Sequence, residues 1–121
     1  MSGFSSVLLD DLNIELDEAG KVISIWGVCP HTRWNMKTLS PPKATSGEVF
    51  VLTDQPLQQG IAIRLTPTGK YCPTYADQTE GWVWIQKEPD PTTAVLTSPG
   101  VIFEIGRHGE LCGLWLRLTP A

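Results

Sequence analysis

Cysteine and histidine are the residues of this 121-residue sequence that are best suited to metal or nucleophilic chemistry. Cys29 and His31 stand on either side of a proline, and His108 precedes Cys112 by four residues. Two thiolates and two imidazoles would satisfy a tetrahedral zinc ion. The spacing matches no zinc finger or knuckle, and the sequence has no Cys-x-x-Cys pair, so we predict no metal and no cofactor.

The same cysteines have other interpretations. The Cys-Pro-His segment at 29–31 could hold a nucleophile and its base, with Arg33 helping to supply the electropositive setting that a thiolate needs. The simpler interpretation is a loop thiol beside a surface histidine. Cys72 and Cys112 each follow a glycine by three residues, where a third matching segment has isoleucine, and this indicates small hydrophobic residues in strands.

Three places in the chain hold carboxylates that a hydrolase could use: Asp10-Asp11, Asp17-Glu18 and Glu104. Acid–base catalysis needs two carboxyl groups close together in a cleft with separated pKa values, and the sequence alone provides no such geometry. Glu104 alternates with apolar neighbours, which predicts that its side chain lies on a solvated face of a sheet. We therefore assign no catalytic residues.

The five tryptophans are the most suggestive set of residues. Trp82 and Trp84 flank a valine, so in a strand both side chains face the same side. Trp34 begins a segment that resembles the one beginning at Trp84. If exposed, these indoles would stack on a sugar or another planar ligand, and if buried, they fill a core. We predict a ligand-binding site formed by Arg33, Trp34, Trp82, Trp84 and Gln86, with burial of the indoles as the competing interpretation.

The elements that must position these residues show a threefold pattern. A Val-Leu start recurs at residues 7, 51 and 95, and each start is followed by a strand, a turn and a second strand. The turns end in Gly20, Gly69 and Gly109, and the second strands close on Trp26, Tyr75 and Trp115. Such self-similarity is typical of folds that stack one unit. We predict positive φ at the three glycines and one shared core for the three aromatics, although hairpins of any β-rich chain resemble one another.

No amphipathic helix pattern is found, and ten prolines and eleven glycines separate short segments rich in strand-forming residues. Strands are expected at 5–9, 12–17, 21–27, 33–38, 48–53, 60–66, 70–75, 81–87, 93–97, 101–106 and 110–118. The segment 39–47 is expected to be a surface loop. We predict a single all-β domain over residues 1–121, a compact closed barrel or sandwich of about ten short strands. A β-trefoil-like barrel with three pseudo-repeats is the first topology, and an antiparallel barrel with a ligand cavity is the second.

The composition indicates the class of protein and the compartment in which it works. The chain is 41% hydrophobic and 18% charged with a net charge of −4, which is typical of a globular rather than a disordered chain. Its nine Lys and Arg are scattered, and this argues against nucleic-acid binding. No apolar run is long enough to cross a bilayer, and the start lacks a signal-peptide pattern. Three cysteines without an export signal predict free thiols and a cytoplasmic location.

Two classes of function stay open. The first is a non-enzymatic binding module that recognises a carbohydrate or a protein through loops and exposed aromatics. The second is a small β-barrel that holds an apolar small molecule in its interior, with or without catalysis. Tryptophans on an outer groove would favour the first class, and aromatics lining an interior cavity would favour the second. The lack of a recognisable catalytic set favours binding, with no nucleic acid and no membrane among the partners.

Overall fold

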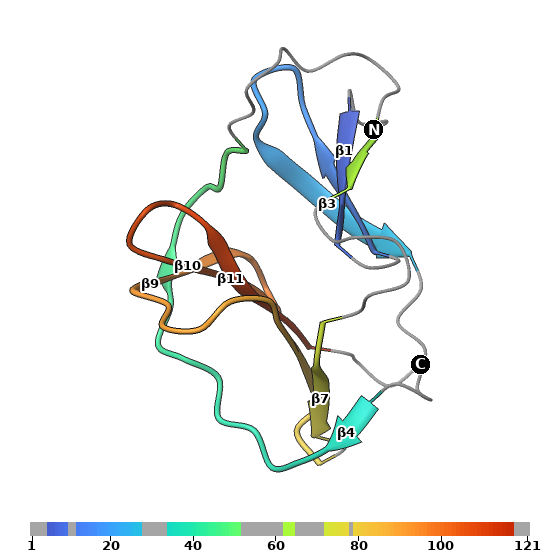
Figure 1. Cartoon of the computed structure of the whole chain (residues 1–121), viewed down its shortest axis with the longest axis vertical. Helices are drawn as coiled ribbons and strands as arrows, with labels where there is room; N and C mark the ends of the chain where they lie inside the picture. Colours follow the sequence, from blue (N-terminus) through green and yellow to red (C-terminus); the bar gives the residue numbers. More distant parts are fainter. Residues whose placement is uncertain are drawn as a thin grey trace. The chain divides into compact units, whose positions relative to one another are not determined.

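The computed structural model describes residues 5–9, 12–27, 34–51, 62–64, 72–77 and 79–117. These residues form eleven strands and no helix (Figure 1), so the predicted all-β class is confirmed. No helix long and apolar enough to span a membrane occurs among them. Most strands fall where the sequence predicts them. The expected strand at 48–53 is replaced by a shorter one at Thr45–Ser46 and an isolated bridge at Phe50.

The chain divides into two compact units, each with its own sheet. One unit combines Met1–Cys29 with Glu48–Tyr71, and the other combines Pro30–Gly47 with Cys72–Ala121. The single domain expected over residues 1–121 stays a prediction.

The sheet of the first unit has four strands in the order β3-β2-β1-β6. They are β1 (Ser5–Leu9), β2 (Leu12–Leu16), β3 (Val22–Gly27) and β6 (Ala62–Arg64). The first three form an antiparallel meander, and β6 joins the outer edge of β1 in parallel. Alternation along the strands gives one buried apolar face, made of Val7, Leu9, Leu12, Ile14, Leu16 and Val22.

The sheet of the second unit has seven strands in the order β4-β7-β8-β11-β10-β9-β5. They are β4 (Trp34–Met36), β5 (Thr45–Ser46), β7 (Thr74–Asp77), β8 (Trp82–Gln86), β9 (Thr93–Ser98), β10 (Val101–Ile105) and β11 (Leu111–Arg117). The five strands β7 to β11 pair antiparallel, whereas the short edge strands β4 and β5 pair in parallel. The residues that alternate toward one face are buried and aliphatic or phenyl, among them Val83, Ile85, Phe103 and Leu114. The opposite face carries Tyr75, Trp84 and Trp115, and we call it the aromatic face.

The predicted closed barrel is not found. Within the described residues both sheets are open, with β3 and β6 at the edges of one and β4 and β5 at the edges of the other. The threefold pattern is not shown either. β6 and β7, the strands on either side of Gly69, lie in different sheets instead of forming the second hairpin.

Two of the predicted hairpins are confirmed in detail. Gly20 has φ 85° between β2 and β3, and Gly109 has φ 83° between β10 and β11. In both turns the glycine N–H donates to the carbonyl three residues before it, that of Asp17 or Gly106. Glycine takes this left-handed conformation without a Cβ clash. Gly69 lies outside the described residues.

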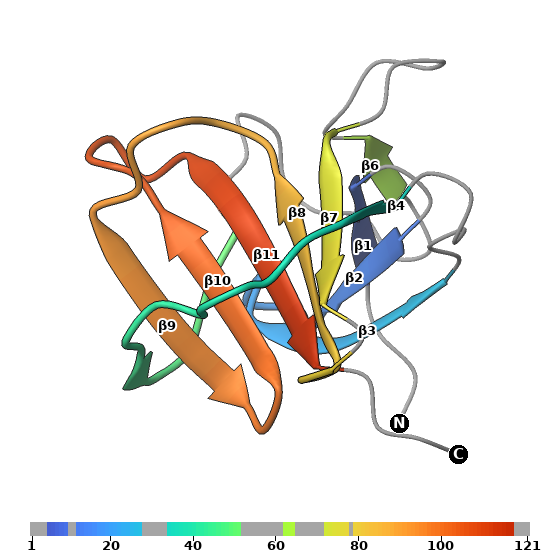
Figure 2. The same ribbon diagram turned by 90° about the horizontal axis from the view of Figure 1, so that it is seen from below.

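One segment crosses the aromatic face from edge to edge. Residues 37–44, which we call the strap, join β4 to β5 and appear in Figure 2 as the teal tube that passes in front of β11 and β10. Seven strands at about 4.8 Å spacing are about 29 Å wide, and the strap with its two junctions can reach about 30 Å. The strap is therefore extended. Leu39, predicted in a surface loop, is only 6% exposed and packs with Ile102 and Trp115, because the strap has a sheet face beneath it.

Asp77 fastens the strap to the sheet. Its Oδ2 accepts a hydrogen bond from the N–H of Leu39 at 2.9 Å, and its Oδ1 accepts from the N–H groups of Thr79 and Glu80. The bond from Leu39 is the main cause that lowers the pKa of Asp77 below its ordinary value, while burial acts in the opposite direction. The ionised carboxylate is thus preferred in the folded chain.

We expect the stability of the fold to fall in acid through Asp77. A carboxyl whose pKa is lowered by folding stabilises fully above its unfolded pKa of about 3.9, and the contribution is lost as pH falls through the folded pKa. Asp77→Asn removes this titration, so its urea midpoint should decline less between about pH 5 and pH 2 than that of the wild type. Tryptophan fluorescence in urea would measure both. Asp90→Asn, at an exposed loop position, is the matched control, and an unchanged acid slope in Asp77→Asn would contradict the role of Asp77.

Candidate functional site

Register brings one row of apolar side chains together on the aromatic face. Tyr75 of β7 lies opposite Trp84 of β8, which lies opposite Trp115 of β11. The row continues through Ile102 of β10 to Leu96 of β9. Side chains opposite one another on neighbouring strands are in contact range. The row is therefore aromatic on the β7 side of the sheet and aliphatic on the β9 side.

The aromatic rings in this row stack on one another. Ring centroids of Trp84 and Trp115 are 5.2 Å apart at an interplanar angle of 14°, and those of Tyr75 and Trp84 are 5.3 Å apart at 31°. Trp82 meets Trp115 edge-on, with centroids 6.0 Å apart. Trp84 thus has a ring neighbour on each side, and it offers an edge rather than a free face to a planar ligand. We call Tyr75, Trp82, Trp84 and Trp115 the aromatic cluster.

The tryptophans of this face belong partly to the core and partly to the surface. Trp115 is 4% exposed and belongs to the core with Leu39. Trp82, Trp84 and Tyr75 are half-buried and pack against that core. The cluster therefore joins the core to the surface of the second unit.

A buried carboxylate holds Trp84 in place. The indole N–H of Trp84 donates to Oε1 of Glu104 at 2.8 Å. Glu104 is on β10 and reaches Trp84 across Gly113 of β11, where an added Cβ would meet both the carboxylate and the indole nitrogen. The prediction that Glu104 lies on a solvated face is wrong, since it is 7% exposed and its carboxylate lies against the Trp84 indole across Gly113.

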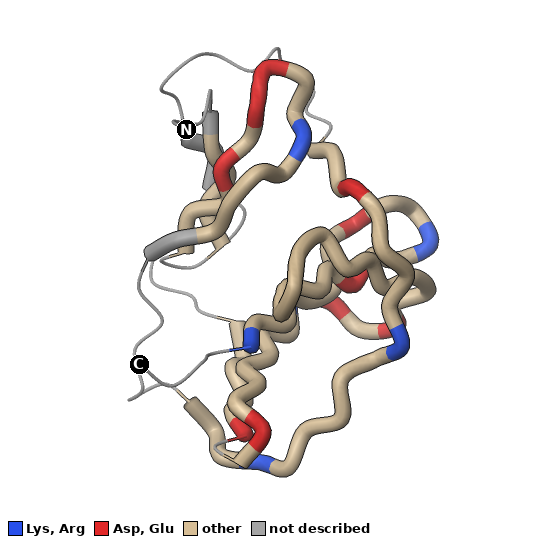
Figure 3. The backbone as a smooth tube through the Cα atoms, turned by 180° about the vertical axis from the view of Figure 1, so that it is seen from behind, with Lys and Arg blue, Asp and Glu red and all other residues tan. Residues whose placement is uncertain are grey.

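Two cations lie over the outer rings of the cluster. The Nζ of Lys37 is 5.1 Å from the ring centre of Tyr75, and the guanidinium carbon of Arg117 is 5.8 Å from that of Trp82. Arg117 also donates through Nε to the carbonyl of Glu80. These distances are within cation–π range. The half-exposed part of the cluster is thus bordered by positive charge, although charged residues are spread over both units (Figure 3).

Trp115 carries a polar atom that its surroundings do not satisfy. Its indole nitrogen is buried and has no hydrogen-bond partner within the described part of the chain. Buried Trp N–H groups usually find an acceptor, and leaving a donor unpaired costs about 1–3 kcal/mol. This donor lies in the residue on which Leu39 of the strap packs.

The structure brings together only part of the predicted site. Trp82, Trp84 and Gln86 alternate onto the aromatic face, and Gln86 lies opposite Gly113 at one end of it. Trp34 lies opposite Thr74, which register places on the other face of the sheet. Arg33 is outside the described residues.

Of the three predicted core aromatics, two meet. Tyr75 and Trp115 both pack on Trp84. Trp26 belongs to β3 in the other sheet, and its side chain is outside the described residues.

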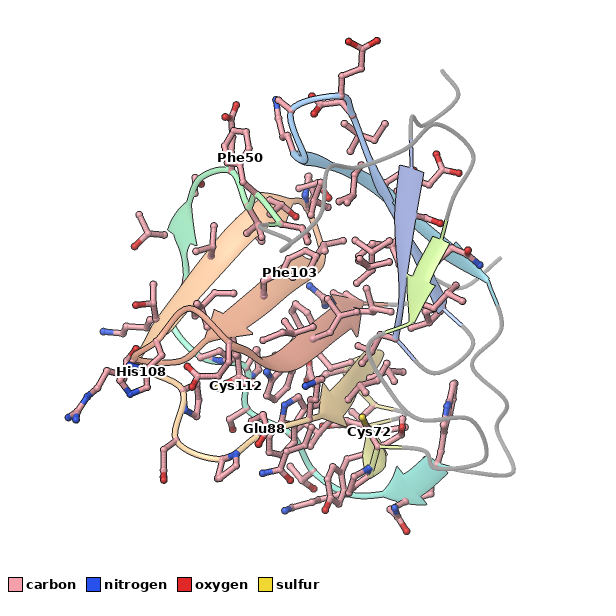
Figure 4. The ribbon with its side chains drawn as sticks, turned by 45° about the horizontal axis from the view of Figure 1, so that its top comes forward. Phe50, Cys72, Glu88, Phe103, His108 and Cys112 are labelled. Carbon is pink, nitrogen blue, oxygen red and sulfur yellow. The ribbon has the colours of Figure 1, made fainter. Side chains whose placement is uncertain are left out.

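The cysteine and histidine candidates do not converge on a site within the described chain. Cys72 lies just before β7, Cys112 is a free thiol buried in β11, and His108 lies at the exposed tip of the hairpin that precedes β11 (Figure 4). Burial raises the pKa of the Cys112 thiol, and nearby carboxylates add to the effect, so its thiolate is disfavoured. The described residues contain no group of three or more His, Cys, Asp or Glu that could hold a metal ion. Segments 29–31 and 10–11 lie outside them.

Sequence reasoning did not assign Tyr75, Glu104, Lys37 and Arg117 to the site. The alternation in each strand is readable, but the pairing of β8 with β11 and of β4 with β7 joins distant segments, and no local signal marks it. Comparison of the chain with models of protein families, with curated proteins and with solved structures finds no match. The site is therefore interpreted from its own geometry.

The bond between Trp84 and Glu104 can be tested by stability. Glu104→Ala leaves the indole N–H without an acceptor, and we expect a loss of about 1–3 kcal/mol in the free energy of unfolding. Glu104→Gln retains an acceptor oxygen and should lose less. Urea unfolding followed by tryptophan fluorescence measures both, with Glu18→Ala at an exposed turn position as the control. Equal losses for Ala and Gln would show that the hydrogen bond is not what Glu104 contributes.

Proposed function

We propose that this protein is a non-enzymatic binding module that recognises another protein with the half-exposed part of the aromatic cluster. The observation that carries the proposal is a set of tryptophan and tyrosine rings that are half-exposed yet fixed. Trp84 is held by two stacked neighbours and a buried carboxylate. A side chain that is already ordered loses little conformational entropy when a partner binds.

The composition of this surface supports a protein partner. Trp, Tyr and Arg are the residues in which interface hot spots are enriched, and Trp82, Tyr75 and Arg117 lie there together.

Ring geometry supports a protein over a carbohydrate. A sugar would need an open ring face to stack on, whereas both faces of Trp84 have ring neighbours and Lys37 lies over Tyr75. The other alternative, an apolar ligand inside a closed barrel, gains no support from the open sheets. A cytoplasmic location, expected from the cysteine content, is part of the proposal.

A charge reversal at the border of the cluster tests this function. We expect peptides selected from a phage-displayed library on the wild-type protein to bind Arg117→Glu at least about tenfold more weakly, because the partner meets Arg117 over Trp82. Arg107→Glu is the matched control, since this exposed arginine is in the hairpin turn away from the cluster. Circular dichroism confirms folding of both variants.

The same proteins applied to a glycan array supply the alternative outcome. Binding of glycans together with a failure to select any peptide would contradict the proposal. So would peptide binding that Arg117→Glu leaves unchanged.

A further inference from the structure

We infer that the partner is an extended segment containing proline, and that it competes with the chain's own strap for the aromatic face. The inference rests on the proposed function and names the partner's chemistry. It starts from the segment that already lies there. The strap is extended, contains Pro41 and Pro42, and inserts Leu39 between the sheet and solvent.

The strap shows what kind of chain the aromatic face accepts. Proline-rich segments dock on aromatic surfaces because they are extended beforehand and therefore lose little entropy on binding. The prolines at 41 and 42 have no N–H to satisfy. The first half of the strap is fixed by two hydrogen bonds, from the N–H of Lys37 to Ala76 and from the N–H of Leu39 to Asp77.

The strap is also an incomplete ligand. It covers Trp115, whose indole N–H is buried without an acceptor among the described residues. A segment that crosses the same row and presents a backbone carbonyl to this N–H would make the hydrogen bond that the strap does not make. Extended proline-containing chains present their carbonyls in this way, because they form no internal hydrogen bonds.

Charge indicates what flanks the prolines. Arg117 of β11 borders the cluster at Trp82 and is not part of the strap. The strap carries Lys37 at its start and Lys43 near its end, so it brings positive charge to a face that already holds Arg117. A partner with acidic residues at these two places would bring the opposite charge, which Arg117 attracts.

The strap then sets the apparent affinity for the partner. A ligand that binds only when the face is open has its affinity reduced by the fraction of molecules that are open. Leu39 is the buried anchor of the strap, so Leu39→Ala raises the open fraction. Ser40→Ala changes the next, exposed residue and is the matched control.

The test uses a fluorescein-labelled peptide, Glu-Thr-Leu-Ser-Pro-Pro-Glu-Ala, which is the strap sequence with both lysines replaced by glutamate. We expect fluorescence anisotropy to show binding to Leu39→Ala at least about tenfold tighter than to the wild type or Ser40→Ala. A version with Gly-Gly in place of Pro-Pro should bind at least about tenfold more weakly. Should Leu39→Ala fail to fold, Asp77→Ala, which removes the acceptor for the Leu39 N–H, replaces it.

Nuclear magnetic resonance follows the unpaired donor directly. The indole ¹H–¹⁵N signal of Trp115, assigned with Trp115→Phe, should move downfield when the peptide binds, whereas that of Trp84, already bonded to Glu104, should move less. Equal affinity of all variants, indifference to the Pro-Pro sequence, or an unmoved Trp115 signal would overturn the inference. If library peptides still bind the wild type through Arg117, the proposed function stands without it, and if no peptide binds any variant, both fall.

Discussion

The short connection between the two edges of the seven-stranded sheet constrains everything beneath it. Because the strap has almost no length to spare, it must run close to the sheet. The side chains of the row that it crosses must therefore be apolar and must leave room for it above the sheet. Leu39 fits this requirement, and so does the row from Trp115 to Leu96. Polar groups on this face find partners within the sheet, as Glu104 and Trp84 do across Gly113. The indole N–H of Trp115 finds none among the described residues.

The two sheets share an arrangement of strands. Each has an antiparallel meander, β1-β2-β3 or β9-β10-β11, with a parallel strand added beside its first member. The second hairpin of each meander has a positive-φ glycine in its turn, and a register shift precedes that turn at Glu15/Leu16 or Glu104/Ile105. The likeness read from the first and third sequence segments therefore corresponds to matching hairpins. The middle segment forms no such hairpin, because its strands β6 and β7 are divided between the two sheets.

Local chemistry made much of this predictable. Alternation and turn residues located most strands, and the glycines at 20 and 109 were assigned to the correct turns. Pairing between distant strands was not predictable, because alternation fixes which way a side chain points along its own strand but not which strand lies beside it. Glu104 shows the consequence: its polarity and its alternation both indicated solvent, and its carboxylate is instead held by Trp84 of β8 across Gly113 of β11. The stacking of Trp84 between Tyr75 and Trp115 has the same origin.

The parallel pairing of β4 with β7 and of β5 with β9 has a consequence for how the chain folds. β7 and β8, and β9, β10 and β11, pair with their neighbours in sequence and can form as hairpins with short loops, after which β8 pairs with β11. The strands at the two ends of the strap must instead pair with strands far along the chain. Closing such long loops before their stabilising contacts form is slow. We expect the five-stranded group to form first and the strap to settle last. During that interval the aromatic rings and both sheet edges are uncovered, and open edges are what neighbouring chains pair with. Late docking of eight residues thus ends the period in which newly made chains are most prone to aggregate.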